Sequence, residues 1–208
     1  MGFPTELALA TRNPGKIREI QEICAGWPVR WRLAEGLNGR SDGPASWPDV
    51  EESGETYLDN ARLKAHAVAE ALGVPAVADD SGIEVDALGG EPGPLSARFA
   101  GPNATDRGNL DLLIQRIRPV APDARTCRYR CVAVCAWPDG RSVWAEGTCE
   151  GWLILEPRGT GGFGYDPIFV PEGGDRTMAE LSAEEKNVIS HRGKALRALG
   201  DILARSAD

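Results

Sequence analysis

The chain contains 208 residues, 42% of them hydrophobic and 26% charged, and carries a formal net charge of −8. That length allows one large domain or two small lobes with a substantial buried core. A protein that binds phosphate backbones in general needs a basic surface, so the negative charge argues against a nucleic-acid partner. An anionic ligand would require locally concentrated lysine, arginine or metal.

The N-terminal stretch MGFPTELALATRN lacks the basic region and the apolar run of a signal peptide. No later segment has the length and hydrophobicity of a membrane-spanning helix. We therefore expect a cytoplasmic protein with no membrane partner.

The predicted elements begin with ELALA at residues 6–10, which has the apolar pattern of a short buried strand. Asn13 and Pro14 are a favourable N-cap and first residue for a helix that follows at once. A second strand is predicted over VRWRLA, which starts at Val29. Residues 36–54 are polar and rich in glycine and proline, and a loop of this length is typically functional or mobile.

A second helix is predicted from Glu55, because apolar residues recur at helical spacing until Gly73 ends the pattern. The next stretch, PAVADDSGIEVDAL, is expected to form two short strands interrupted at residues 79–82. A third helix is predicted over residues 105–118.

The remaining predicted elements are a hairpin and a C-terminal helix. Residues 125–137 and 141–151 have the pattern of two strands joined by a Pro-Asp-Gly turn. Ser182 and Glu185 form a candidate capping box for the helix. No repeat and no linker divides the chain, so we expect a single domain over residues 1–208, of the α/β class with a mixed sheet.

The chain has five cysteines, an odd number that does not suggest a disulfide framework. Cys127, Cys131 and Cys135 are spaced by four, which is compatible with a metal or iron-sulfur site. The surrounding sequence favours a strand, however, in which these three residues share one face. We therefore predict that they are small buried hydrophobic residues.

The turn from Thr11 to Lys16 places a hydroxyl, an amide, a glycine and a lysine at the start of a predicted helix. Backbone N–H groups and the helix dipole favour a phosphate group at such a position. The spacing is not that of a P-loop. An ordinary capped helix start accounts for the same residues equally well.

Asp79 and Asp80 are adjacent carboxylates that follow a hydrophobic stretch. If they close a strand, they lie where α/β folds commonly bind ligands, and carboxylates there are suitable ligands for Mg²⁺. An Asx-type turn with solvated carboxylates is the alternative. Glu51 and Glu52, at the end of the long loop, are either a further metal ligand or surface charges.

Asn60 and Lys64 lie four residues apart on the second predicted helix and therefore share a face. Lys64 is thus a candidate phosphate ligand, with a solvated lysine as the alternative. Near the C-terminus, Lys186, His191 and Arg192 offer donors for carbonyl or phosphate oxygens. A cationic surface patch explains these three residues as well.

The stretch GTGGFGYDPIF, residues 159–169, contains four glycines within six residues. Such a cluster indicates either a tight turn or a close approach by another molecule. Phe163 beside it offers a face on which a planar base can stack.

Together these stretches resemble the inosine/xanthosine triphosphate pyrophosphatase family, whose members remove deaminated purine nucleoside triphosphates from the nucleotide pool. The resemblance rests on ATRNPGK, ETYLDNARLKA, VADDSGIEVDALGGEPGPLSARFAG, GTGGFGYDPIF and ELSAEEKNVISHRGKAL. These stretches occur in the order found in the family, between residues 10 and 196. Each is weakly specific alone, but the combination is highly specific.

The resemblance implies an elongated mixed sheet flanked by helices, with two lobes, an active-site cleft between the lobes, and a homodimer. It also implies Mg²⁺-dependent hydrolysis of XTP, dITP and ITP, in which Asp80 helps to deprotonate the attacking water and Asp79 orients or tunes its neighbour. Attack at the α-phosphorus releases pyrophosphate and leaves the monophosphate.

The resemblance also assigns the site residues by position. Asp80 is the catalytic carboxylate, and Glu52 and Asp80 are the Mg²⁺ ligands, with Glu51 as the neighbouring alternative to Glu52. The triphosphate ligands are Thr11, Asn13, Lys16 and Lys64. The remaining substrate contacts are Ser81, Phe163, Gly164, Tyr165, Asp166, Lys186, His191 and Arg192.

One departure from the family pattern is Arg12, where a small residue is common. A catalytically silent purine-nucleotide sensor is an alternative function, but Asp80, Lys16 and Lys186 are all present and count against it. An RNA-binding module that uses Arg12 and Arg192 is a third possibility, which the acidic composition disfavours.

Overall fold

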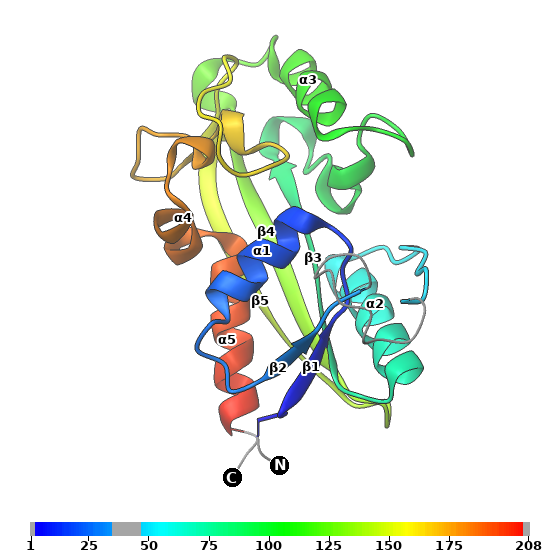
Figure 1. Cartoon of the computed structure of the whole chain (residues 1–208). Helices are drawn as coiled ribbons and strands as arrows, with labels where there is room; N and C mark the ends of the chain where they lie inside the picture. Colours follow the sequence, from blue (N-terminus) through cyan, green and yellow to red (C-terminus); the bar gives the residue numbers. More distant parts are fainter. Residues whose placement is uncertain (1–2, 35–46, 206–208) are drawn as a thin grey trace. The chain divides into compact units, whose positions relative to one another are not determined.

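The structure of the protein, a computed structural model, describes residues 3–34 and 47–205. It contains a six-stranded sheet in the order β2-β1-β3-β4-β5-β6 (Figure 1). The strands are β1 (Glu6–Leu9), β2 (Arg30–Arg32), β3 (Ala76–Val85), β4 (Thr126–Ala136), β5 (Ser142–Leu153) and β6 (Phe169–Pro171). The α-helices are α1 (Pro14–Ile23), α2 (Tyr57–Leu72), α3 (Asp106–Ile117), α4 (Ala183–Ile189) and α5 (His191–Arg205).

Strand β1 runs parallel to both β2 and β3, whereas β5 and β6 are antiparallel, so the sheet is mixed. This arrangement confirms the predicted α/β class. The chain divides into two compact units. Unit 1 contains Met1–Asp80, Cys131–Glu146 and Arg192–Asp208, and unit 2 contains Ser81–Arg130 and Gly147–His191. Strands β3, β4 and β5 contribute residues to both units.

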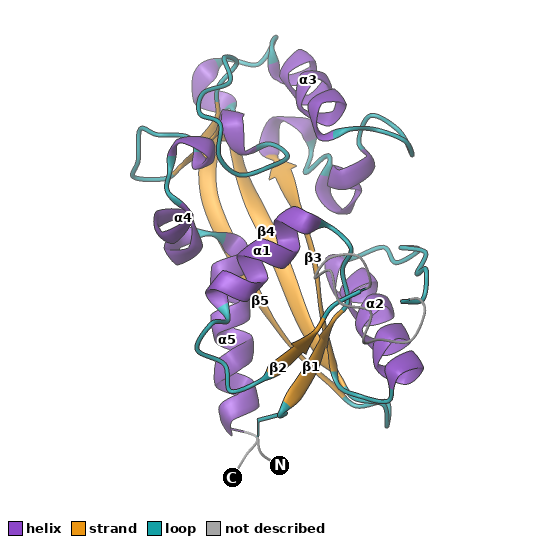
Figure 2. Ribbon diagram, in the orientation of Figure 1, coloured by secondary structure: helices purple, strands orange, loops and turns teal. Residues whose placement is uncertain are grey.

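The core of unit 1 consists of two clusters, because successive residues of a strand point to opposite faces of the sheet. Leu9 packs in a cluster with Ile20 of α1 and Leu199 of α5. Ala8, its neighbour in β1, lies in the other cluster with Ala65 of α2. Helices α1 and α5 therefore cover one face of this part of the sheet, and α2 covers the other (Figure 2).

Unit 2 has one cluster of buried apolar residues. Ile83 of β3, Tyr129 of β4 and Phe169 of β6 pack there with Leu113 of α3 and Met178. The face of β4 that carries Tyr129 is therefore apolar and buried within this unit.

Several local predictions are confirmed. The Asn13 side chain caps α1 by accepting hydrogen bonds from the N–H groups of Gly15 and Lys16. Helix α2 ends at Gly73, whose φ of +65° is a left-handed conformation that glycine favours. The hairpin of β4 and β5 turns before Arg141, and the Gly140 N–H donates to the Trp137 carbonyl.

The predicted interruption at residues 79–82 is wrong, since β3 runs without a break from Ala76 to Val85. Aspartate, serine and glycine are poor strand formers in general. Here β3 lies between β1 and β4 in the sheet, and the two carboxylates have cationic partners, as described below. Tertiary interactions thus override the local preference.

The C-terminal helix is also divided, contrary to the prediction of one helix. The capping box of Ser182 and Glu185 is present, but it starts only the short helix α4. Ser190 has an extended backbone, with ψ of 152°, between α4 and α5. Serine is a favoured residue immediately before a helix, which explains why the new helix α5 begins after Ser190.

Residues 36–46 of the predicted long loop lie outside the described residues. The prediction for the cysteines is confirmed, because Cys127, Cys131 and Cys135 are all buried in β4. Burial raises the pKa of the Cys135 thiol to about 12. Among residues 3–34 and 47–205, no group of three metal-binding side chains is found. No helix in these ranges is long and apolar enough to cross a membrane.

Candidate active site

The two adjacent carboxylates lie on opposite faces of β3. Asp79 contacts side chains from α1 and α5, whereas Asp80 contacts side chains from α2. Strand β1 pairs with β3 only as far as Leu9 opposite Val77, so both carboxylates lie just beyond the carboxyl end of β1. We expected the two carboxylates at the end of their own strand. They lie instead beyond the end of the neighbouring strand β1, while β3 itself continues.

Asp79 is at the centre of a buried ion-pair network in unit 1. Its Oδ2 lies 3.2 Å from Nζ of Lys16 and accepts a hydrogen bond from Nε of Arg192 at 3.1 Å. Sγ of Cys131 is 3.8 Å from the same oxygen. Burial raises the pKa of Asp79, but the charges of Lys16 and Arg192 outweigh it and hold that pKa well below its ordinary value. Asp79 is therefore ionised at neutral pH.

Arg192 also donates to Glu19 of α1, at a short separation between Nη1 and Oε2. The guanidinium is 2% exposed, and its neighbouring carboxylates hold its pKa above the ordinary value although burial lowers it. We expected Arg192 to complete a base pocket. In the structure Arg192 donates to two carboxylates of unit 1, those of Asp79 and Glu19. It shares Asp79 with Lys16, the candidate phosphate ligand.

Asp80 contacts the polar face of α2 that the sequence predicted. Its Oδ1 lies 3.3 Å from Nζ of Lys64, and its Oδ2 accepts a hydrogen bond from Nδ2 of Asn60 at 3.3 Å. Lys64 also donates to Oε1 of Glu52 at 2.6 Å. Two carboxylates from different segments thus converge on one ammonium group.

The charges around Asp80 shift two pKa values. Burial raises the pKa of Asp80, and the nearby carboxylates of Glu52 and Asp79 add to this effect, which Lys64 and Lys16 only partly offset. Burial lowers the pKa of Lys64, but the three carboxylates outweigh it and the net shift is upward. An ionised Asp80 therefore requires a cation nearby.

The segment that carries Glu52 is tied to the turn after β1. Arg12 donates to the Trp47 carbonyl at 2.8 Å and lies 3.7 Å from the Asp49 carboxylate. Glu51 is exposed, whereas Glu52 reaches Lys64. Of these two glutamates, Glu52 is the one that shares a cationic partner with Asp80.

Thr11 and Asn13 lie at the start of α1, as predicted. Oδ1 of Asn13 is occupied by capping, and Oγ1 of Thr11 accepts a hydrogen bond from the Asn13 N–H at 3.2 Å. The structure thus contains the ordinary helix cap that the sequence analysis left as an alternative. Lys16 in the first turn adds a cation at the helix N-terminus, where the helix dipole already favours a bound anion.

A second polar group lies in unit 2, around the Asp166 carboxylate. Asp166 is 3% exposed, and its Oδ2 accepts hydrogen bonds from Nζ of Lys186 at 2.5 Å and from the Phe163 N–H at 2.8 Å. The same ammonium lies 5.0 Å from the centre of the Phe163 ring, a cation–π arrangement. Tyr129 donates its hydroxyl to Oδ1 of Asp166 at 3.3 Å.

The glycines before Phe163 allow close packing within the chain itself. A Cβ at Gly159 would collide with the backbone of Ala179, and a Cβ at Gly162 would collide with the Asp166 carboxylate. Gly162 also has a φ of +68°, which side chains rarely adopt. These glycines therefore form a tight turn around Asp166, the first of the two explanations that the sequence offered.

The other predicted substrate residues of unit 2 are placed as follows. His191 is 5% exposed and stacks on Tyr129, with ring centres 4.6 Å apart and planes 10° apart. Tyr165 is buried and donates its hydroxyl to the Ser96 carbonyl at 2.7 Å. The Gly164 N–H donates to Asp106 at 3.2 Å. Ser81 is half-buried and follows Asp80 directly in β3.

Sequence reasoning did not identify Glu19 or Tyr129, each of which contacts predicted site residues. Glu19 lies in α1 three residues after Lys16, but no local pattern indicates that its partner is Arg192, 173 residues away. Tyr129 occupies an inward position of a strand, which predicts burial and nothing more.

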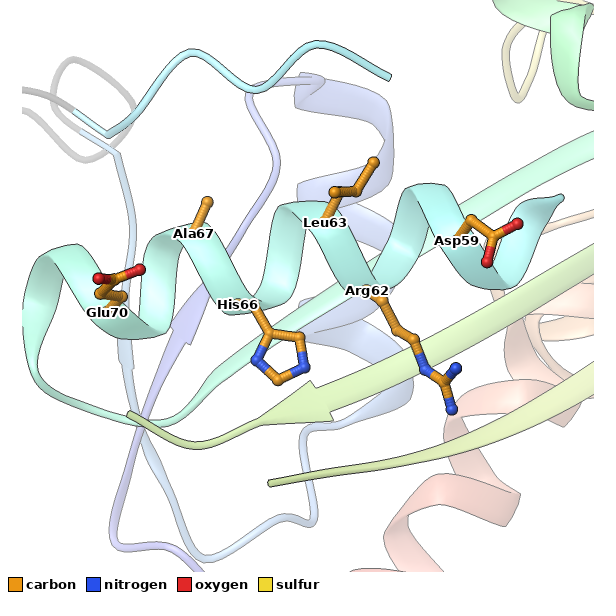
Figure 3. A pocket seen from close by; sticks show the side chains of 6 residues that line it. All are labelled: Asp59, Arg62, Leu63, His66, Ala67 and Glu70. Atoms are coloured by element: carbon orange, nitrogen blue, oxygen red, sulfur yellow. The ribbon is translucent and has the colours of Figure 1, made fainter. Parts of the chain in front are cut away.

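The second histidine, His66, lies elsewhere in unit 1. It lines a shallow hollow on α2 together with Asp59, Arg62, Leu63, Ala67 and Glu70 (Figure 3). Lys64 and Asn60, which face Asp80, do not line this hollow.

Known proteins resemble the chain over nearly its whole length. The profile of the Ham1 family matches residues 7–202. A dITP/XTP pyrophosphatase of Streptomyces coelicolor is 54% identical over 195 residues, which cover 94% of this chain and 95% of that protein. An enzyme of the same name from Thermus thermophilus is 51% identical over 195 residues, which cover 93% and 89% of the two chains.

Solved structures give the same result. A HAM1 protein from Coxiella burnetii is 37% identical and superposes with a TM-score of 0.82, over 96% of this chain and 98% of that one. The nucleoside-triphosphatase, or dITP/XTP pyrophosphatase, of Mycobacterium abscessus is 39% identical with a TM-score of 0.71, over 93% and 97% of the two chains. The chain therefore belongs to the Ham1 family.

Proposed function

We propose that the protein hydrolyses XTP, dITP and ITP to the monophosphate and pyrophosphate, with Mg²⁺ as its cofactor. That the chain is a hydrolase of the nucleoside-triphosphate pyrophosphatase class follows from its full-length likeness to curated enzymes of that name. The observation that carries the finer proposal is the arrangement around Asp80, where Glu52 and Lys64 meet a buried carboxylate.

The residues of unit 1 suit the triphosphate end of the substrate. Lys16 and Lys64 are cations with mostly buried side chains, 16% and 14% exposed, and Lys16 lies at a helix N-terminus. Charges with little contact to water act more strongly on a phosphate than exposed ones do. We assign Arg192 to this group, where it stabilises Asp79 and, through Asp79, the position of Lys16.

The donor set around Lys64 fits Mg²⁺. Oε1 of Glu52 and Oδ1 of Asp80 both contact one positive group, the Lys64 ammonium, at 2.6 Å and 3.3 Å. Carboxylate oxygens are the ligands that Mg²⁺ prefers, and one or two of them commonly suffice when substrate phosphates and water complete the shell. When bound there, Mg²⁺ would neutralise the charge that develops on the phosphate oxygens.

Asp80 is the group placed to accept a proton from the attacking water. A carboxylate within hydrogen-bond reach of the attacking water can serve as its general base. Asn60 donates to Oδ2 of this carboxylate and so fixes its orientation. Water attacks the α-phosphorus, the bond to the bridging oxygen breaks, and pyrophosphate leaves with that oxygen while Asp80 takes the proton.

The residues around Asp166 suit the purine base. Phe163 offers a ring for stacking, and the side chains of Lys186 and His191 carry donors. Hypoxanthine and xanthine present an oxygen acceptor at position 6, where adenine presents an amino donor. A site rich in donors leaves adenine with donor facing donor, and unpaired buried polar groups are costly enough to discriminate strongly.

The test is the substitution Asp80→Asn, which keeps the size of the side chain and removes its ability to accept a proton. We expect pyrophosphate release from ITP to fall by at least about 100-fold, the contribution typical of a general base. Calorimetry should still detect ITP binding, because Lys16 and the residues around Asp166 are unchanged.

Asp111→Asn is the matched control, since Asp111 pairs with Arg107 on the surface of α3. It should release pyrophosphate at the wild-type rate. An Asp80→Asn protein that binds ITP and turns over at the wild-type rate would show that another group is the base.

A further inference from the structure

Tyr129 contacts two side chains, Asp166 and His191, that belong to the group we assign to purine binding. It is 7% exposed and lies on the inward face of β4, in the apolar cluster of unit 2. Its hydroxyl donates to Asp166, and its ring stacks on the imidazole of His191. No pattern in the sequence suggested a functional role for it.

The contacts of the Tyr129 ring fix the plane of the imidazole. The two rings are 4.6 Å apart and nearly parallel, with planes 10° apart. Phe169 packs against the same tyrosine with ring centres 4.6 Å apart, at an angle of 43°. The stacking contact therefore holds the imidazole in one plane, because tilting the ring would break the parallel contact.

The hydroxyl of Tyr129 helps to fix the second of these side chains, the Asp166 carboxylate. Oδ1 of Asp166 accepts from Tyr129, while Oδ2 accepts from Lys186 and from the Phe163 N–H. Both carboxylate oxygens are thus bound, and the carboxylate cannot rotate without losing donors. The positions of Lys186 and Phe163 depend in turn on this carboxylate.

Tyr129 itself takes no part in proton transfer. Burial raises the pKa of its phenol well above the ordinary value, and the Asp166 carboxylate adds to this effect. The phenol therefore remains protonated at neutral pH and serves as a hydrogen-bond donor.

We propose that Tyr129 is a positioning residue that holds Asp166 and His191 in a fixed arrangement and thereby determines selectivity for the purine base. This inference rests on the proposed function. It predicts that changes at Tyr129 affect base recognition more than cleavage of the phosphoanhydride, because its hydroxyl and ring contact Asp166 and His191. The carboxylates that we assign to metal binding and proton transfer, Glu52 and Asp80, instead contact Lys64 of α2.

Two variants separate the contributions of the hydroxyl and the ring. Tyr129→Phe removes the donor to Asp166 and keeps a ring to stack on His191, whereas Tyr129→Leu removes both. Cys127→Ala is the control, since Cys127 is buried in the same cluster two residues earlier in β4. A cooperative thermal transition for each variant shows that it is folded.

The measurement is KM and kcat for pyrophosphate release from ITP and from ATP, at equal Mg²⁺. For Tyr129→Phe we expect KM for ITP to rise about two- to tenfold, as for the loss of an ordinary hydrogen bond, with kcat changed less than about twofold. The preference for ITP over ATP should fall by the same factor as KM rises, and further in Tyr129→Leu. Cys127→Ala should match the wild type.

Two results would overturn the inference. If the wild type is active and prefers ITP, and both Tyr129 variants keep that preference or lose only kcat, Tyr129 has no role in base selection and the inference alone fails. If the wild type releases no pyrophosphate from ITP, the proposed function fails and the inference fails with it.

Discussion

Replacing Asp79 by asparagine removes the central negative charge of the ion-pair network in unit 1 and keeps the size of the side chain. The Asp79 side chain is fully buried and contacts Lys16 at 3.2 Å and Arg192 at 3.1 Å. In the variant, both cations keep their charge but lose a carboxylate partner. Arg192 is 2% exposed, so water cannot replace that partner.

The size of the effect follows from this burial. Removing one partner of a buried ion pair typically costs about 3 to 5 kcal/mol, because the remaining charge stays buried. Glu19 still pairs with Arg192, so we expect a loss near the lower limit, about 3 kcal/mol. For a chain of this size, that loss corresponds to a fall in Tm of roughly 6 to 12 °C.

The effect should also depend on pH in a defined direction. Burial raises the pKa of Asp79, but Lys16 and Arg192 outweigh it, and the pKa in the folded protein lies below that of the unfolded chain. Asp79 therefore stabilises the fold above about pH 4, near the ordinary aspartate pKa, and this contribution is lost as the pH falls further. The difference between the wild type and Asp79→Asn should shrink below that pH.

The assay is urea unfolding followed by tryptophan fluorescence and circular dichroism, at pH 7 and at several values down to pH 3. Asp111→Asn, which breaks an exposed i,i+4 pair, should change stability by no more than about 0.5 kcal/mol. An Asp79→Asn protein that unfolds within about 1 kcal/mol of the wild type at pH 7 would refute the reasoning, because the buried cations would then not need this carboxylate.

The remaining predictions concern neighbouring residues that differ in their contacts. Glu52→Gln should raise the Mg²⁺ concentration needed for half-maximal activity by about tenfold or more, whereas Glu51→Gln should leave it unchanged, because only Glu52 contacts Lys64. Metal titration of activity checks this, and equal shifts would contradict it. Gly162→Ala should lower Tm more than Gly164→Ala: both have positive φ, but only a Cβ at Gly162 collides with Asp166. If calorimetry gives the same fall in Tm for both variants, backbone strain alone explains it and the predicted collision with Asp166 is contradicted.

The parts of the fold that depend on neighbouring residues were predictable from the sequence. The cap at Asn13, the stop at Gly73 and the turn before Arg141 are each specified within a few residues. The continuation of β3 through Asp79 and Asp80 was not, because these carboxylates are paired with cations supplied by three separate helices.

The candidate site divides in the same way. The shared face of Asn60 and Lys64 follows from helical spacing, and both do contact Asp80. The role of Glu19 depends on a partner 173 residues later, which no local pattern reveals. The glycines before Phe163 indicated either a tight turn or a close approach by another molecule, and only the structure shows the tight turn, which packs against Ala179 and Asp166 of the same chain.

The most direct test of the proposed activity is pyrophosphate release from ITP, XTP, dITP, GTP and ATP at equal concentration, with Mg²⁺ and with EDTA. We expect release from ITP, XTP and dITP at rates far above those for GTP and ATP, and none from any of them in EDTA. Release that is equal for all five nucleotides would contradict the assignment of the base-binding residues. Release that persists in EDTA would contradict the assignment of Glu52 and Asp80 as metal ligands, and the absence of release from all five would contradict the proposed activity itself.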